Sequence, residues 1–122
     1  MALTMDKRGL VERMCAYNKA VSDHNRMKMI KILGSHEPNT LNVSDIAAIL
    51  GLSQPATTKH LKVMENVGLF DRERQGMSVY YSLNYEALEE YRRLLDFAFE
   101  HASTPCPYGY DCRSCPNSDT CV

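Results

Sequence analysis

The chain has 122 residues and a formal net charge of −1, with 44% hydrophobic and 24% charged residues. This length allows one compact domain with little left over, and the composition is that of an ordinary globular protein. No apolar run in the sequence approaches the roughly 20 residues that a membrane-spanning helix needs, and the N-terminus lacks the features of a secretory signal. We therefore expect a cytoplasmic protein that does not interact with membranes.

The charge is unevenly distributed along the chain. Residues 1 to 34 carry seven basic against three acidic side chains, whereas residues 85 to 122 carry three basic against seven acidic ones. Residues 53 to 76 are again basic, with four Lys or Arg against three acids. Because a nucleic-acid-binding protein needs positive charge on one face only, the small net charge does not exclude DNA binding.

The first third of the chain predicts two helices. Residues 5 to 21 place apolar side chains at helical spacing, although Gly9 weakens the pattern near its start. Asp23 is a favourable N-cap for a second helix, and Gly34 is a favourable end for it.

Two further helices follow with a short turn between them. Ser44 is a favourable N-cap for a short helix that ends at Gly51. Ser53 caps the next helix, Pro55 fits its first turn, and Gly68 ends it. Two helices joined by a turn that contains glycine form a helix-turn-helix.

After this motif the hydrophobic period changes from that of a helix to that of a strand. Residues 69 to 74 and 77 to 83 are extended runs rich in Val, Tyr and Phe, and Gln75 and Gly76 lie between them as a turn. Residues 85 to 101 return to the helical period. The sequence therefore predicts a mainly α-helical fold with a small β-hairpin wing, a winged helix-turn-helix with about five helices.

The chain divides into two parts. We expect residues 1 to 103 to form a domain for DNA binding and dimerisation. Residues 104 to 122 are crowded with turn formers and cysteines and show no helical or strand period, so we expect a separate tail.

The segment from Leu41 to Leu69 reads LNVSDIAAILGLSQPATTKHLKVMENVGL. It resembles the helix-turn-helix of the ArsR/SmtB family of metalloregulatory repressors, with Ser53 and Gln54 opening the recognition helix. The resemblance covers residues 23 to 83 well. It implies a DNA-binding transcriptional regulator, most simply a repressor.

The recognition helix has one polar face. If Leu61, Met64 and Val67 face inward, a step of about 100° per residue turns the other side outward, where it can enter a major groove. Gln54 can pair there with adenine edges, and lysines suit phosphates or guanine. His60 lies nearer the buried stripe, so we expect it to pack or cap. With the hairpin tip included, the candidate DNA-contacting residues are Ser53, Gln54, Thr58, Lys59, Lys62, Arg72, Arg74 and Gln75.

The resemblance also implies two places where family members usually bind their ligands. The first is a set of cysteines on the first helix of the motif, but residues 44 to 50 contain no cysteine. The second is a zinc site on the last helix, where the corresponding spacing in this chain gives Asn84, Glu86, Phe97 and Glu100. A phenylalanine cannot ligate zinc, so we expect neither usual site here.

Four of the five cysteines follow the pattern Cys106-x5-Cys112-x2-Cys115-x5-Cys121. In a reducing cytosol such a cluster is more typical of metal binding or redox response than of a static disulfide. Four thiolates can bind zinc or a softer metal or metalloid in a tetrahedral site, or hold an iron-sulfur cluster. Thiol-disulfide switching and idle thiols are the alternatives. Cys15, alone on the first helix, is expected to be a small buried hydrophobe.

We expect a homodimer that binds an inverted repeat in double-stranded DNA, because such dimers place two recognition helices in successive major grooves. The first and last helices should form the interface, since their apolar stripes exceed what a small core can cover. The tail would then leave the last helix at this interface and act as the sensor.

An enzyme would need a substrate cleft beside a reactive cysteine, which we do not expect in so short a chain. A protein-interaction module is the remaining class, and salt-dependent DNA binding would separate it from a regulator.

Overall fold

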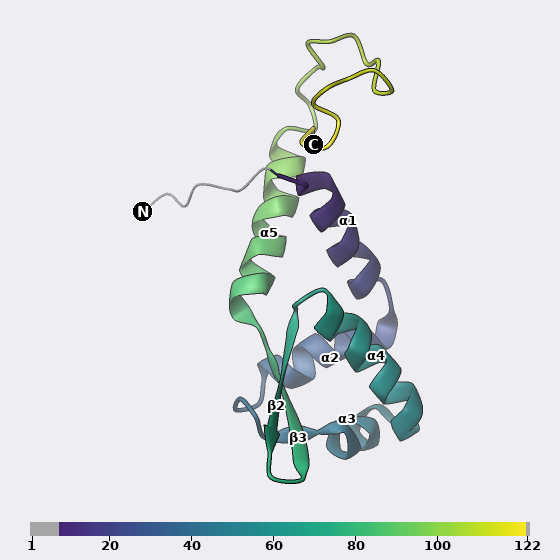
Figure 1. The fold of residues 1–122 in the computed structure, drawn as a ribbon, viewed down its shortest axis with the longest axis vertical. Helices are drawn as coiled ribbons and strands as arrows, with labels where there is room; N and C mark the ends of the chain where they lie inside the picture. Colours follow the sequence, from purple (N-terminus) through teal and green to yellow (C-terminus); the bar gives the residue numbers. More distant parts are fainter. Residues whose placement is uncertain (1–7, 122) are drawn as a thin grey trace.

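A computed structural model describes residues 8 to 121. The helices are α1 (Leu10–Val21), α2 (His24–Gly34), α3 (Val43–Leu50), α4 (Gln54–Asn66) and α5 (Tyr85–Glu100), and the strands are β1 (Leu41–Asn42), β2 (Phe70–Gln75) and β3 (Ser78–Leu83). The predicted winged helix-turn-helix with five helices is confirmed. In Figure 1, α2, α3, α4 and the sheet form one body, and α1 and α5 project from it together toward the turns of the C-terminal tail. None of the helices within residues 8 to 121 is long and apolar enough to span a bilayer.

Two of the predicted helix caps are confirmed. The carboxylate of Asp23 accepts a hydrogen bond from the backbone amide of Asn25 at 2.8 Å, and the hydroxyl of Ser53 accepts one from the amide of Ala56 at 3.2 Å. Each bond satisfies an amide that a helix N-terminus leaves without an internal partner. These caps set the starts of α2 and of the recognition helix α4.

The start of α3 differs from the prediction, because Asn42 and not Ser44 is its N-cap. The side chain of Asn42 accepts from the amide of Asp45 at 2.9 Å, and the carboxylate of Asp45 accepts from the amide of Asn42 at 3.0 Å. This reciprocal capping box satisfies two amides at once and starts the helix at Val43. The hydroxyl of Ser44 is therefore exposed on the first turn and available for another partner.

The N-terminal helix α1 begins at Leu10, later than the predicted start at residue 5. Gly9 has a φ of 59°, in the left-handed region that glycine adopts without strain, and this conformation interrupts helical backbone. Residues 5 to 7 of the predicted helix lie outside the described residues. Cys15 lies about 100° around the helix from the buried Met14 and is exposed, so the prediction that it is buried is wrong.

The wing is the hairpin of β2 and β3. Gln75 pairs with Ser78, so the turn residues are Gly76 and Met77, one position later than predicted. Gly76 has a φ of 63°, a conformation that two-residue hairpin turns favour at this position. The turn carries Met77 out into solvent, where its side chain is 96% exposed.

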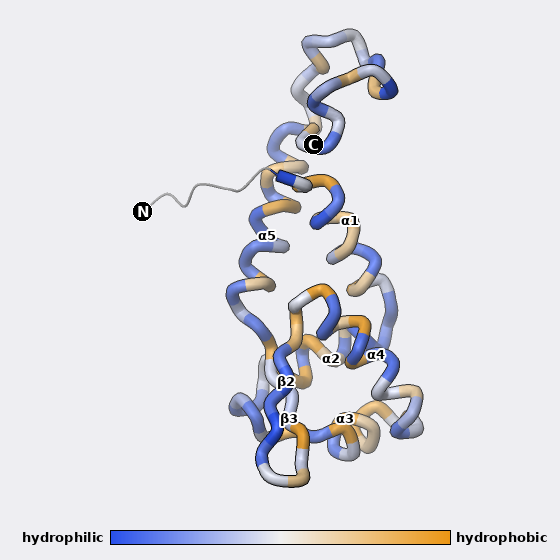
Figure 2. The backbone as a smooth tube through the Cα atoms, viewed as in Figure 1, coloured by the Kyte–Doolittle hydropathy of each residue, from blue (hydrophilic) through white to orange (hydrophobic). Residues whose placement is uncertain are grey.

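A third strand, β1, completes the sheet in the order β1-β3-β2. Leu41 pairs with Tyr81 in antiparallel register, which joins the start of α3 to the wing. Around this frame one core contains the fully buried side chains Leu10, Met29, Ile46, Leu61, Met64, Leu69, Phe70 and Leu94. Figure 2 shows hydrophobic positions concentrated in the helices, whereas β2 and much of the tail are hydrophilic.

Candidate nucleic-acid interface and cysteine tail

The recognition helix α4 has a buried side and an exposed side. Thr57, Leu61 and Met64 face the core, and the Thr57 hydroxyl donates to the carbonyl of Ser53 at 2.8 Å. The predicted DNA-contacting residues of this segment are all exposed: Ser53, Gln54, Thr58, Lys59 and Lys62. The inward packing of α4 therefore leaves a mainly polar face directed to solvent, which also includes Pro55 and Val63.

Gln54, at the start of this face, is held by the other helix of the motif. Its Nε2 atom donates to the hydroxyl oxygen of Ser44 on α3 at 2.8 Å. The amide nitrogen carries two hydrogens, so one N–H and Oε1 remain available for the edge of a base. No local sequence pattern indicates this role for Ser44, because only the crossing of α3 and α4 brings it to Gln54.

The wing residues differ in their surroundings. The Nε atom of Arg72 lies 3.6 Å from a carboxylate oxygen of Glu65, near the end of α4. Arg74 donates from Nε to the carbonyl of Gly76 at 3.3 Å, and Gln75 is exposed beside the turn. Arg74 and Gln75 therefore lie nearest the tip, whereas Arg72 is engaged by an acid farther from it.

His60 lies on the other side of α4, partly buried against the start of α2. Its Nδ1 atom is 3.0 Å from a guanidinium nitrogen of Arg26 and 3.9 Å from the carboxylate of Asp23. The pKa of Asp23 is lowered from its ordinary value, first by the hydrogen bond from the Arg26 backbone amide and further by that from Asn25. These contacts agree with a packing role for His60 and tie the recognition helix to α2.

The projecting helices α1 and α5 are joined by polar contacts. The Tyr17 hydroxyl donates to one carboxylate oxygen of Glu90 at 2.6 Å, and Arg13 donates to the other at 3.1 Å. The hydroxyl of Tyr91 donates to the side-chain oxygen of Asn18 at 2.6 Å. Burial, together with the hydrogen bond to Glu90, raises the pKa of Tyr17 to about 12. The hydroxyl is thus a protonated donor at neutral pH, and it fastens α1 to α5.

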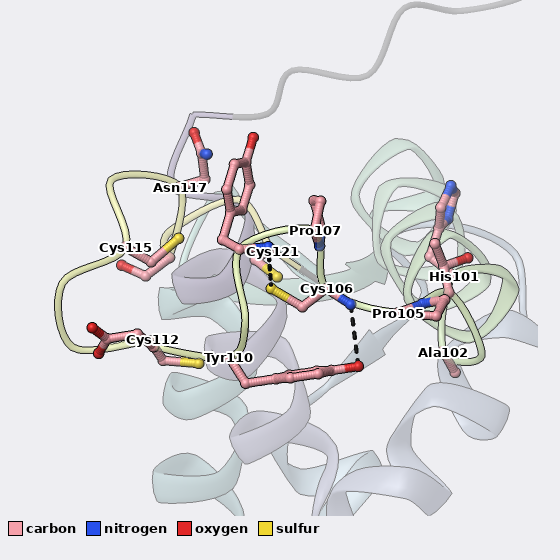
Figure 3. Close-up of a pocket in the computed structure, with 14 residues that line it drawn as sticks. His101, Ala102, Pro105, Cys106, Pro107, Tyr110, Cys112, Cys115, Asn117 and Cys121 are labelled. Atoms are coloured by element: carbon pink, nitrogen blue, oxygen red, sulfur yellow. Dashed lines mark hydrogen bonds between the residues drawn. The ribbon is translucent and has the colours of Figure 1, made fainter.

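Beyond α5, the tail is a series of turns around a hollow of about 410 Å³. All four tail cysteines line this hollow: Cys106, Cys112, Cys115 and Cys121 (Figure 3). The amide of Tyr108 donates to Cys106 Sγ at 3.3 Å, and the amide of Cys106 donates to the Tyr110 hydroxyl at 3.1 Å. Within residues 8 to 121, no three Cys, His, Asp or Glu side chains are grouped so as to hold one ion. The cysteines thus surround one space without converging on one point.

The tail also returns to the N-terminus of α1. The carbonyl of Asp119 accepts a hydrogen bond from the amide of Val11 at 3.0 Å. This amide belongs to the first turn of α1, which Gly9 begins without a side-chain cap. Asp119 lies in sequence between Cys115 and Cys121, so a short stretch of backbone links these two cysteines to α1.

Comparison with known proteins agrees with this arrangement. The family model described as "Bacterial regulatory protein, arsR family" matches residues 23–71. The chain is 34% identical over 83 residues to a cadmium resistance transcriptional regulatory protein CadC homolog of Staphylococcus aureus; the match covers 68% of this chain and 64% of that protein, slightly under two thirds of its length. It is 31% identical over 72 residues to the transcriptional repressor SdpR of Bacillus subtilis, covering 59% of this chain and 77% of that protein.

A solved structure shares the fold of this chain. The solution structure of the homodimeric winged helix-turn-helix DNA-binding domain Mb0332 of Mycobacterium bovis superposes with a TM-score of 0.61 at 22% identity, covering 87% of this chain and 97% of that one. Helix α5 and the cysteine tail lie outside the residues that the family model matches. The chain belongs to the arsR family of bacterial regulatory proteins, and it is a transcriptional regulator rather than an enzyme.

Proposed function

We propose that this protein is a homodimeric transcriptional repressor that binds an inverted repeat in double-stranded DNA and whose DNA affinity is controlled through its cysteine tail. The observation that carries the DNA-binding part is the exposed, mainly polar face of α4, opposite its buried Leu61 and Met64. Repression is supported by SdpR, which is named a transcriptional repressor.

The roles on DNA follow from the chemistry of each group. Lys59 and Lys62 neutralise phosphates, and Gln54 reads an adenine edge with the N–H and Oε1 that its bond to Ser44 leaves available. Thr58 and Ser53 supply hydroxyls within the same groove. On the wing, Arg74 and Gln75 reach the neighbouring backbone or minor groove, and Arg72 contributes once it leaves its acidic partner on α4.

The dimer forms through α1 and α5. These helices project from the DNA-binding body, and α5 carries Tyr85 and Phe99 with 59% and 71% of their surfaces exposed. A second copy would cover such apolar surface, and the Mycobacterium bovis domain of the same fold is described as homodimeric. To enter successive major grooves, the two α4 helices of this dimer must lie about 34 Å apart.

The sensor is the tail, which we treat as a unit of residues 104 to 122 attached to a domain of residues 1 to 103. A zinc ion, another thiophilic metal or metalloid, or an iron-sulfur cluster on the four cysteines would reorder the backbone on either side of Asp119. The bond from Val11 to Asp119 passes this change to α1, which is fastened to α5. A coupling of about 1 to 3 kcal/mol would change operator affinity about 5 to 150-fold, with loading favouring release. The CadC homolog is named for cadmium resistance, which supports a soft-metal ligand.

A redox switch is the second candidate. All five cysteines are free thiols, and the four tail cysteines line the same hollow, where an oxidant can join them in pairs as disulfides. Disulfide formation within the tail would change the same backbone that contacts Val11. Loss of DNA affinity with an oxidant but not with metal would select this candidate.

The proposal of DNA binding is tested by fluorescence anisotropy titrations at several salt concentrations. Two duplexes are compared. One contains an inverted repeat that the full-length protein selects from a random library, and the other has a random sequence. Lys59→Ala should weaken binding to both and reduce the salt slope by about one, because one phosphate contact is lost. Lys31→Ala, at an exposed position on α2 outside the candidate DNA-contacting residues and the proposed dimer helices, is the charge-matched control and should leave the slope unchanged. Binding that does not respond to salt, or equal affinity for the two duplexes, would contradict the proposal.

A further inference from the structure

We infer that the four tail cysteines hold a [4Fe–4S] cluster rather than a single metal ion, an assignment that rests on the proposed role of the tail as the sensor. A single tetrahedral ion such as zinc, about 2.3 Å from each sulfur, draws the four sulfurs to roughly 3.8 Å from one another. The cysteines of this tail instead surround a hollow of about 410 Å³, and no three candidate ligands among the described residues are grouped around one ion position. An open space that is lined by thiols on several sides suits the iron-sulfur core of a cluster, in which each cysteine sulfur binds a different iron.

The spacing favours the same ligand. Structural zinc sites commonly use two short-spaced pairs of ligands, whereas this tail has one such pair, Cys112 and Cys115. The outer cysteines Cys106 and Cys121 lie at the same five-residue interval on either side of it. Two of the four, Cys106 and Cys115, are followed directly by proline, as is the last cysteine of the bacterial iron-sulfur motif.

Sulfur is the predominant donor type around the hollow. Besides the four cysteines, its lining side chains with a carboxylate or an imidazole are Asp111 and His101, whose Nδ1 atom lies 2.8 Å from the carbonyl of Phe97 at the end of α5. The Tyr108 amide donates to Cys106 Sγ at 3.3 Å, and hydrogen bonds to the cysteine sulfurs are one of the means by which proteins tune these clusters. On loading, the four thiols lose four protons to solvent and each sulfur bonds to a different iron of the core.

Cluster loading has a direct structural consequence in this chain. Cys115 and Cys121 would be tied to the same core, which restrains the intervening backbone that includes Asp119. That restraint acts on the hydrogen bond between Asp119 and Val11 at the start of α1. Loss of the cluster in air would remove the restraint, so we expect the DNA affinity of the loaded protein to change on exposure to oxygen.

The test uses the full-length chain purified without oxygen. One sample receives equal amounts of ferrous and ferric iron together with sulfide, which supply the two Fe2+, two Fe3+ and four S2− of a [4Fe–4S]2+ core, and a second receives zinc sulfate alone. We expect the first to retain four irons and four sulfides per chain with a broad visible absorption, and the single replacements Cys106→Ser, Cys112→Ser, Cys115→Ser and Cys121→Ser each to lose most of both. Cys15→Ser, on the exposed surface of α1, is the matched control and should retain the full cluster. Circular dichroism of each variant verifies that the helices are intact.

Three results would contradict the assignment of a [4Fe–4S] cluster. They are one zinc per chain bound through the four thiols with no stable iron and sulfide, a cluster that survives in Cys106→Ser, and no metal retained in either sample. If zinc binds and changes operator affinity, the tail remains a sensor and only the cluster assignment fails. If the variant with all four tail cysteines replaced still responds as the parent does, the proposed function itself fails.

Discussion

Ser44 and Gln54 lie ten residues apart in the sequence, and their hydrogen bond links the two helices of the DNA-binding motif. A long glutamine side chain has several rotamers, and ordering it on DNA costs conformational entropy. The bond to Ser44 orders Gln54 before DNA arrives. Ser44 can serve in this way because Asn42, two residues earlier, caps α3.

Ser44→Ala should therefore reduce sequence discrimination with little effect on general DNA affinity. A neutral hydrogen bond contributes about 1 kcal/mol, so we expect roughly a fivefold loss of preference at the base pair that Gln54 reads in each half-site. The measurement compares anisotropy titrations of the selected operator and of operators with each base pair changed in turn. Gln54→Ala should lose preference at the same position. A Ser44→Ala protein that discriminates as well as its parent while Gln54→Ala does not would show that the bond has no role in recognition.

At the scale of the elements, the contact of α1 with α5 depends on the protonated hydroxyl of Tyr17, which donates to Glu90. Because the pKa of Tyr17 is raised from 10 to about 12, the folded state holds this proton more tightly than the unfolded state does. The stabilisation is complete below pH 10 and is lost as pH rises from about 10 to about 12. Deprotonation would place a phenolate beside the carboxylate of Glu90.

Tyr17→Phe tests this contact. At pH 7 it should lower the free energy of unfolding by about 1 to 2 kcal/mol, since the hydrogen bond to a charged acceptor is lost. The decline in stability of the parent above pH 10 should be smaller in the variant. Urea unfolding followed by circular dichroism, at fixed protein concentration from pH 7 to pH 11, measures both effects. Parallel pH profiles for parent and variant would contradict the assignment.

The elements themselves were largely predictable because their signals are local. Apolar spacing located all five helices, and the caps at Asp23 and Ser53 follow from side-chain chemistry within three residues. The two-residue strand β1 was not predictable, because two residues show no alternation and the strand depends on its pairing with Tyr81. The same strand brought Asn42 into the extended conformation of an N-cap and so displaced the predicted cap at Ser44.

The candidate site also has features that local sequence patterns predict and features that they do not. The exposure of the recognition face follows from helical periodicity, and so the predicted side chains of α4 are found where expected. The exposure of Cys15 was mispredicted because the buried stripe of α1 is narrower than its apolar residues suggested. The Ser44–Gln54 bond and the bond from Val11 to Asp119 join distant segments, and no local pattern indicates them.

At the scale of the whole molecule, the proposed dimer places the apolar end of α5 against a second copy. Phe99→Glu should disrupt that interface, because it would bury an unpaired charge, and should weaken operator binding along with the dimer. Sedimentation velocity at micromolar concentration measures the assembly state. Met27→Glu, at an exposed apolar position on α2, is the control and should remain dimeric. If Phe99→Glu sediments as the parent dimer does, the end of α5 is outside the interface.

Control of DNA binding by the tail is the central claim, and operator affinity with and without loading of the tail tests it most directly. The parent, the Cys15→Ser protein and the variant with serine at all four tail positions are titrated onto the same labelled operator, before and after treatment with zinc or with ferrous iron, ferric iron and sulfide. We expect loading to weaken operator binding of the first two proteins by about 5 to 150-fold, while the four-serine variant keeps the unloaded affinity throughout. A four-serine variant that leaves the operator on the same treatment as the parent would contradict it.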